Sequence, residues 1–166
     1  MIIAIDVHYR EDEAKIVGVF FENWTDENAA YVRETFKTDV AEYESGAFYK
    51  RELPCILQIL NEIDLQNVEI IVIDGYVFLD DFQKAGLGFH LFEALAQQKI
   101  VIGVAKTSFH QNSRYVKPVF RGESERPIFV SAIGMELDEA AQHIHEMYGA
   151  FRMPKLLQEL DSLTKS

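Results

Sequence analysis

Three acidic residues occupy positions from which their side chains can bind a metal ion. Asp6 lies in the apolar run of residues 2–7, and Asp74 closes a second apolar run at 70–74. Glu52 opens a segment with helical periodicity. A carboxylate at the end of a buried strand is costly unless a cation or hydrogen-bond donors compensate its charge. Two such strands, with a helix that brings a third acid, therefore indicate a divalent-metal site.

Hydrophobic periodicity indicates the elements that must position these acids. Apolar runs and alternation predict strands at 1–9, 14–24, 31–37, 69–74 and 100–104, and a late hairpin from 115–120 and 127–133. Leucine and isoleucine at helical spacing predict helices that start near Phe48 and cover 84–98, 137–148 and the segment after Pro154.

This order of elements predicts an α/β fold. Three antiparallel strands followed by helix–strand crossovers make a mixed sheet with helices on both faces. An aspartate in the first strand beside one that ends the fourth is the arrangement of the ribonuclease H-like fold. Taken alone, the pattern is equally compatible with aspartates that cap strand ends. The chain has 166 residues, which are enough for a sizeable core, and we expect all of it, 1–166, to form one domain.

The composition limits the cellular setting. Cys55 is the single cysteine, which excludes a disulfide framework and a cysteine-rich zinc site. No apolar stretch approaches the ~18 residues that a membrane-spanning helix needs. The first residues carry no basic stretch of the kind that opens a signal peptide. We therefore expect a cytoplasmic monomer that has no membrane partner.

The charge distribution bears on nucleic-acid binding. The net charge of −11 argues against sequence-blind binding, because phosphate backbones attract Lys and Arg. The segment 99–126 reverses this sign, with six basic and two acidic residues. It is either a local basic strip or ordinary scatter of surface charge. On the first interpretation, added salt weakens nucleic-acid binding through Lys106, Arg114, Lys117 and Arg121.

Six segments, taken in order, resemble the motifs of one enzyme family. They are Ile-Asp-Val-His-Tyr at 5–9, the loop and helix start at 43–54, Val-Ile-Asp-Gly at 72–75, the glycine- and histidine-bearing segment 86–91, Ile-Gly-Val-Ala-Lys-Thr at 102–107 and Ala-Phe-Arg-Met-Pro at 150–154. Over residues 1 to about 161 the chain resembles the endonuclease V family. These are metal-dependent nucleases with a ribonuclease H-like fold that cut DNA or RNA near deaminated bases.

The resemblance implies roles for individual residues. Asp6, Glu52 and Asp74 would hold Mg²⁺ or Mn²⁺, which activates water for attack on a phosphodiester. Lys106 would meet the scissile phosphate or the attacking water, and the alternative for it is a solvated lysine at a strand end. Arg51 would orient Glu52 or contact phosphate, and a plain ion pair at the helix start is equally compatible.

The resemblance also assigns the nucleic-acid contacts, but here the chain departs from the family pattern. Tyr43 and Gly46 match a wedge loop of the form Pro-Tyr-x-Pro-Gly, and Gly75 follows the aspartate of the Asp-Gly motif. Glu42 and Ser45 replace both prolines of that loop. Other residues replace the family's His-Gly pair and His-Pro-Arg run at 76–82. Ile133 lies near the position where the family has a further histidine. We therefore expect a preference for single-stranded or flexible substrates and weak selection of deaminated bases.

These departures support an alternative from a different functional class. The chain would then be a ribonuclease H-like binding or interaction protein that keeps the fold and has lost catalysis. Binding of Mn²⁺ that depends on Asp6 and Asp74 distinguishes the two hypotheses.

Overall fold

A mixed sheet runs through the computed structural model, which describes residues 1–45, 47–108 and 112–166. Its strands are β1 (Ile2–Arg10), β2 (Glu13–Phe21), β3 (Tyr31–Lys37), β4 (Ile70–Asp74), β5 (Ile100–Ala105), β6 (Lys117–Val119) and β7 (Ile128–Ile133), in the order β3-β2-β1-β4-β5-β7-β6. The first three strands are antiparallel, whereas β4 runs parallel to both β1 and β5. The predicted mixed α/β sheet is therefore confirmed.

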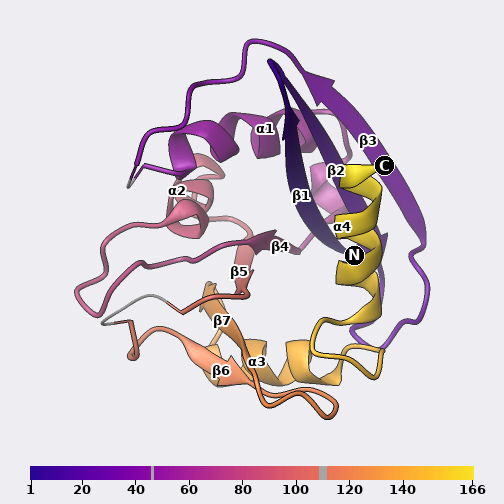
Figure 1. The fold of residues 1–166 in the computed structure, drawn as a ribbon, viewed down its shortest axis with the longest axis vertical. Coiled ribbons are helices and arrows are strands. Elements are labelled where there is room, and N and C mark those ends of the chain that lie inside the picture. The colour runs from indigo at the N-terminus through magenta and orange to yellow at the C-terminus, as the bar shows by residue number, and fades with distance from the viewer. Residues whose placement is uncertain (46, 109–111) are drawn as a thin grey trace.

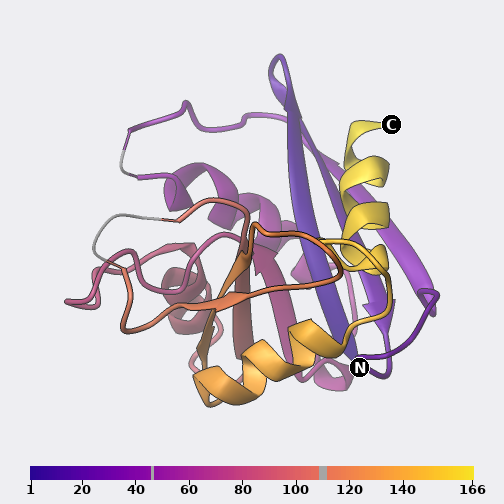
Figure 2. The same cartoon turned by 60° about the horizontal axis from the view of Figure 1, so that its bottom comes forward.

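Helices cover both faces of this sheet (Figure 1). They are α1 (Tyr49–Asn61), α2 (Leu87–Ala94), α3 (Leu137–Glu146) and α4 (Lys155–Lys165), with a short 3-10 turn η1 (Leu65–Asn67) before β4. α1 and α2 pack on one face, and α3 and α4 pack on the other. Figure 2 shows α3 and α4 together on their side of the strands. No helix in the described part of the chain is long and apolar enough to cross a membrane.

The alternation of side chains along β1 decides which face each residue serves. Ile3 and Ile5 enter the core beneath α1 and α2, whereas Ile2 and Ala4 enter the core beneath α3 and α4. Asp6 continues the second series, so its side chain points to the α4 face. β1 therefore contributes apolar side chains to both cores, and its Asp6 lies on the face of the sheet that α4 covers.

The second predicted helix is shorter than its periodicity suggested. The pattern predicted 84–98, but α2 covers only Leu87–Ala94. Gly86 precedes the helix with extended backbone, and a Cβ at this position would lie 2.5 Å from the carbonyl oxygen of Tyr76. Ala96 and Gln97 adopt positive φ after the helix. Close backbone contact at one end and left-handed backbone at the other account for the difference.

Candidate active site

Two of the predicted acids lie side by side on two inner strands of the sheet, where β4 ends. Ile5 of β1 is paired in register with Ile73 of β4, so Asp6 and Asp74 occupy the next positions on adjacent parallel strands. Both aspartates line a cavity of about 470 Å³ between the sheet and α4, which we call the α4-side cavity. The Oδ1 atom of Asp6 accepts a hydrogen bond from the backbone N–H of Val7 at 2.9 Å. The strand register thus assembles the first pair of the predicted triad.

The third acid reaches this pair from the opposite side of the sheet. Glu52 lies in the first turn of α1, and only 8% of it is exposed. The pKa of Glu52 is raised to about 8, by burial first and then by the charges of Asp6 and Asp74, while Tyr9 and Arg51 act to lower it. Glu52 is therefore close enough to the aspartate pair for the three charges to interact.

The pKa values of the two aspartates are also raised. Burial is the largest cause of the raised pKa of Asp6, and burial together with the charge of Asp6 raises the pKa of Asp74 to about 6. Asp74 nevertheless keeps an exposed side chain. The charge of Lys106 lowers the pKa of both aspartates but does not cancel the increase. A further positive charge beside the pair would stabilise the ionised carboxylates.

The donor chemistry of these residues fits a hard divalent cation. Mg²⁺ prefers carboxylate oxygens, and the Asp6–Asp74 pair presents such oxygens on a cavity wall. Within residues 1–45, 47–108 and 112–166, no three His, Cys, Asp or Glu side chains form a cluster that could hold a metal ion. In the described residues, the Asp6–Asp74 pair therefore presents its oxygens to a metal ion, and Glu52 lies near the pair without completing a cluster of three ligands.

Asp161 is a fourth acid that sequence reasoning missed. It lies on α4, lines the α4-side cavity with Asp6 and Asp74, and its charge raises the pKa of both. An ion pair with Lys165 at 3.0 Å balances part of this charge. The signal in the sequence was its spacing, because Asp161 follows Leu157 by four residues and so continues the inward face of the helix.

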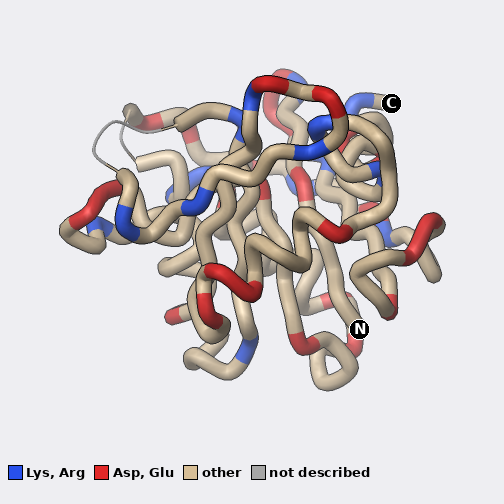
Figure 3. The backbone as a smooth tube through the Cα atoms, turned by 90° about the horizontal axis from the view of Figure 1, so that it is seen from below, with Lys and Arg blue, Asp and Glu red and all other residues tan. Residues whose placement is uncertain are grey.

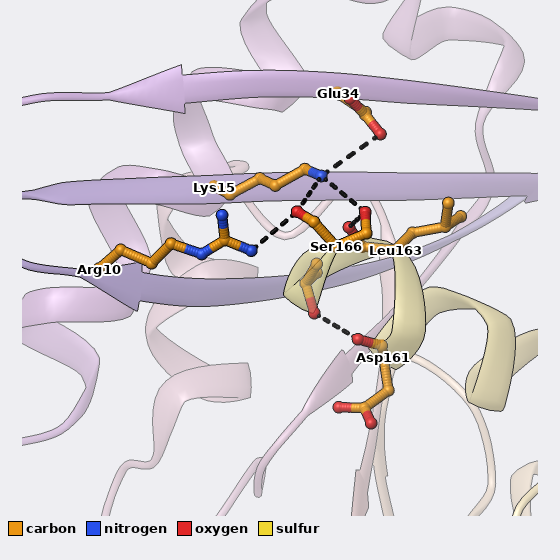
Figure 4. Close-up of polar contacts among 7 residues, drawn as sticks. Arg10, Lys15, Glu34, Asp161, Leu163 and Ser166 are labelled. Carbon is orange, nitrogen blue, oxygen red and sulfur yellow. Dashed lines mark hydrogen bonds and ion pairs between the residues drawn. The ribbon is translucent and has the colours of Figure 1, made fainter.

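Polar contacts at the end of α4 hold this helix over β1 and β2 (Figure 4). The carbonyl oxygen of Ser166 accepts hydrogen bonds from Arg10 at 2.7 Å and from Lys15 at 3.2 Å. Two residues earlier, Thr164 is buried and its Oγ1 donates to the Oδ2 atom of Asp6 at 3.5 Å. These contacts place the inward face of α4, including Asp161, opposite the aspartate pair.

Lys106 lies where two cavities meet. It follows β5 directly and, together with Asp74, lines both the α4-side cavity and a second cavity of about 850 Å³. Arg152 fixes the backbone there, because its Nη2 atom donates to the carbonyl oxygens of Lys106 at 2.6 Å and Pro127 at 2.8 Å. The Arg-x-Pro segment therefore holds the lysine-bearing strand end in place.

The second cavity, which we call the loop-side cavity, is open to the segments that resemble nucleic-acid contacts. Its walls include aromatic, glycine and polar residues: Tyr43, Ser45, Phe48, Tyr49, Gly75, Tyr76, Asp80, Lys84, Thr107 and Ser108. Tyr43 is 64% exposed at this wall. Gly46, predicted beside it, lies outside the described residues. The positions of Tyr43 and Gly75 are compatible with the nucleic-acid contacts that the resemblance implied.

Hydrogen bonds tie down the loop that replaces the family's histidine-bearing run. The Oδ1 atom of Asp80 accepts hydrogen bonds from the backbone N–H groups of Phe82 and Lys84, at 2.9 and 3.0 Å. Asp81 accepts hydrogen bonds from the backbone N–H groups of Ser113 and Arg114, at 2.8 and 2.7 Å. Both acids therefore order the wall of the loop-side cavity.

The predicted basic strip is only partly available for binding. Arg121 is 3% exposed, and its guanidinium donates to the backbone carbonyls of Met147, Gly149 and Phe151. Its predicted contact with phosphate is therefore wrong, because the side chain is committed to holding a loop. Lys117 forms an exposed ion pair with Asp138 at 2.7 Å. Basic and acidic positions are interspersed along the chain in Figure 3.

Gly103 explains how the end of β4 comes so close to β5. A Cβ at Gly103 would lie 2.3 Å from the carbonyl oxygen of Gly75 and 2.8 Å from the Oγ atom of Ser131. That hydroxyl accepts a hydrogen bond from the backbone N–H of Val77 at 3.0 Å. The Asp74–Gly75 turn and the start of the following loop therefore require a residue without a side chain at 103.

Replacing Gly103 with alanine is expected to destabilise the fold by roughly 1–3 kcal/mol, the usual cost of overpacking a tight core. The contact is with backbone, which cannot rotate away, so the Asp74–Gly75 turn must shift. Gly18→Ala is a matched control on β2, because its Cβ would meet side-chain atoms of Ile3 and Ile59, which can shift, and no backbone. Urea denaturation of both variants measures the difference. An equal loss of stability in the two variants would contradict this account.

Comparisons with known proteins identify relatives of this chain. A family model described as Endonuclease V matches residues 1–161. None of the curated proteins that were compared matches the chain. Among solved structures, the fold matches that of Ciona intestinalis endonuclease V in complex with a 24mer DNA containing an inosine followed by a ribo-adenosine, with a TM-score of 0.77 and 20% identity, covering 99% of this chain and 84% of that chain.

Two further solved structures share the fold. The catalytic domain of human endonuclease V matches with a TM-score of 0.74 and 18% identity, covering 99% of this chain and 80% of that chain. Bacillus subtilis endonuclease V matches with a TM-score of 0.71 and 18% identity, covering 99% of this chain and 78% of that chain. At these identities the structural likeness establishes the ribonuclease H-like fold.

Proposed function

The chain belongs to the endonuclease V family, and we propose that it is a divalent-metal-dependent nuclease that hydrolyses phosphodiester bonds in DNA or RNA. One observation carries this proposal. The register of β1 and β4 places Asp6 and Asp74 side by side on a cavity wall that they share with Lys106. Acidic oxygens beside a lysine at a cavity are suited to a metal ion and a phosphate.

Each residue of the site has its own role in the proposed reaction. Asp6 and Asp74 would hold Mg²⁺ or Mn²⁺, with Glu52 and Asp161 as further carboxylates within electrostatic reach of the pair. When bound, the cation supplies Lewis-acid stabilisation and lowers the pKa of water. Lys106, at the junction of the two cavities, would bind the scissile phosphate and neutralise charge that develops on it.

The loop-side cavity would receive the nucleotide next to the cleaved bond. Its opening adjoins Asp74 and Lys106, and its walls carry several aromatic rings. Stacking of a base on an aromatic ring is worth about 1–3 kcal/mol. Tyr43, exposed at this wall, would stack against a base. Arg51 would act on Glu52 rather than on phosphate, because its guanidinium lies over the ring of Tyr9.

We expect substrate choice to favour single strands. The loop around Tyr43 has lost both prolines, so it is less preorganised as a wedge. Extruding a base from a duplex costs a few kcal/mol, which is least where the base is already unpaired. The preference for single strands is measured by cleavage of matched single- and double-stranded oligonucleotides, with and without one inosine, in Mg²⁺ or Mn²⁺. Strong cutting of the duplex only when inosine is present would contradict the expectation.

The same experiment tests the proposed activity itself. Wild-type protein should cut at least one of these oligonucleotides when Mg²⁺ or Mn²⁺ is present and should stop cutting when a chelator removes the metal. The absence of cleavage on every substrate, DNA and RNA alike, would reject the nuclease assignment.

A second candidate function is nucleic-acid or protein binding without catalysis. The observation that favours it is the position of Glu52, which does not join the aspartate pair in a cluster ready for metal. Calorimetric titration with Mn²⁺ separates the two functions. Binding that disappears in Asp6→Asn and Asp74→Asn favours the nuclease, and no binding by wild type favours the second candidate.

A further inference from the structure

Arg121 joins two loops that lie next to the candidate active site. From the 120–127 loop between β6 and β7, its guanidinium donates to the backbone carbonyls at 147, 149 and 151 in the loop between α3 and α4. A Cβ at Gly122 would clash with the carbonyl oxygen of Ala150, so the two backbones are in close contact. The loops lie side by side in Figure 2 and therefore present one surface.

This surface exposes two phenylalanine rings, one from each loop. Phe120 is 54% exposed and Phe151 is 67% exposed, whereas Val119 and Met147 at the start of the loops are buried. Among the residues that the structure describes, no ring contact joins Phe120 or Phe151 to another aromatic side chain. The faces of both rings are therefore accessible to a planar ligand. We call Phe120 and Phe151 the aromatic platform.

The aromatic platform is continuous with the proposed active site. Phe151 directly precedes Arg152, whose Nη2 atom donates to the carbonyl oxygen of Lys106 at 2.6 Å. Met153, the next residue, lines the α4-side cavity. One arginine side chain therefore spans the distance between the platform and the strand end that carries Lys106.

The charges around the platform favour stacking over contacts with phosphate. Glu123 and Glu125 are exposed in the 120–127 loop, and Arg126 is the exposed base of that loop. This balance of charge does not attract a phosphate backbone. Stacking of a base on an aromatic ring needs no such charge and tolerates any sequence, because every base has a π-face.

We propose that Phe120 and Phe151 stack against the bases of a single strand of nucleic acid that extends from the active site. This inference rests on the proposed function, because it takes the strand held at Lys106 to be the substrate. Unpaired bases offer their faces to the rings, whereas the bases of a duplex already stack on one another. The platform therefore adds affinity for single strands and does not select a deaminated base.

The test measures binding while a chelator prevents cleavage. Fluorescence anisotropy gives Kd for a labelled oligothymidine of about 20 nucleotides, longer than a single-strand site of about 4–16. Phe120→Leu and Phe151→Leu remove a ring and keep an apolar side chain, and each should raise Kd about fivefold, the lower limit for one lost stack. Phe36→Leu is the matched control, because Phe36 is 53% exposed on β3, at the opposite edge of the sheet from β6.

An abasic strand of the same length separates stacking from other effects, because it keeps the phosphates and lacks the bases. Wild type and both leucine variants should bind this strand equally. The dependence of Kd on salt should be the same in all three proteins, since no phosphate contact is lost. Phe151→Trp should keep wild-type affinity for oligothymidine, and its fluorescence should change when that strand binds.

The outcomes distinguish this inference from the function on which it rests. Wild-type affinity for oligothymidine in both leucine variants would overturn the platform and leave the proposed nuclease intact. An equal loss on the abasic strand would also overturn it, because the rings would then support the loops and not the bases. Wild-type protein that binds no oligothymidine would overturn the platform, and cleavage in Mn²⁺ would then decide the proposed function separately.

Discussion

Replacing Asp74 with asparagine is expected to reduce cleavage by about 10³-fold, the equivalent of roughly 4 kcal/mol of transition-state stabilisation. Asp74 is the one acid that lines both cavities, so it lies where a metal ion and a phosphate would meet. Asparagine keeps the size of the side chain but loses its charge, which removes the electrostatic attraction for the cation. The measurement is kcat for a single oligonucleotide at saturating Mg²⁺ or Mn²⁺.

The matched control for this substitution is Asp138→Asn. Asp138 is an exposed carboxylate that pairs with Lys117 at 2.7 Å and lines neither the α4-side nor the loop-side cavity. Its replacement should leave kcat unchanged. Asp161→Asn should give an intermediate loss, because Asp161 lines only the α4-side cavity and already pairs with Lys165. Equal cleavage by Asp74→Asn and wild type would refute the assigned role of Asp74.

The metal-free protein is expected to lose stability as pH rises. Burial first, and then Asp6 and Asp74, raise the pKa of Glu52 from 4.5 to about 8 in the folded state. The folded chain therefore binds more protons than the unfolded chain between these values. The contribution of Glu52 is fully present below pH 4.5 and is lost by about pH 8. The slope for one such group is about 1.4 kcal/mol per pH unit.

Two changes should remove this dependence on pH. Glu52→Gln cannot ionise, so its free energy of unfolding should vary less with pH than that of wild type. Saturating Mn²⁺ should restore stability at the upper end of the range, because binding to the folded chain alone contributes about 2.7 kcal/mol at a hundredfold excess over Kd. Urea denaturation with chelator, across the pH range, measures both. A wild-type curve that is flat from pH 4.5 to about pH 8 would contradict the raised pKa of Glu52.

The sequence predicts the frame of the site because strand patterns also determine register. Continuous apolar runs located β1 and β4, and each strand carries its aspartate as the fifth residue. Parallel pairing of the two strands then brings Asp6 beside Asp74 without further information. The helix that carries Glu52 followed from periodicity in the same way. The placement of Lys106 directly after β5 was visible in its apolar run.

Long-range contacts account for what the sequence did not predict. Asp161 joins the site only because α4 folds back over β1 and β2, where its leucines enter the core and Ser166 accepts hydrogen bonds from Arg10 and Lys15. Arg121 belongs to a basic segment by composition, yet three backbone carbonyls bury it. The contact of Arg51 with the ring of Tyr9 likewise joins α1 to β1. Such partners are separated by many residues, so a local pattern such as the spacing of Asp161 shows which face of a helix points inward but not what that face meets.

The most direct test of the proposed metal site is the location of bound Mn²⁺ in crystals grown from the protein, identified by its anomalous scattering. The account predicts an ion between Asp6 and Asp74, with carboxylate oxygens at about 2.0–2.2 Å, near the distances of Mg²⁺ sites. We also expect Glu52 to turn a carboxylate oxygen toward the ion. Saturating Mn²⁺ with no ion at this pair, or an ion held elsewhere while the aspartates remain unbound, would contradict the account.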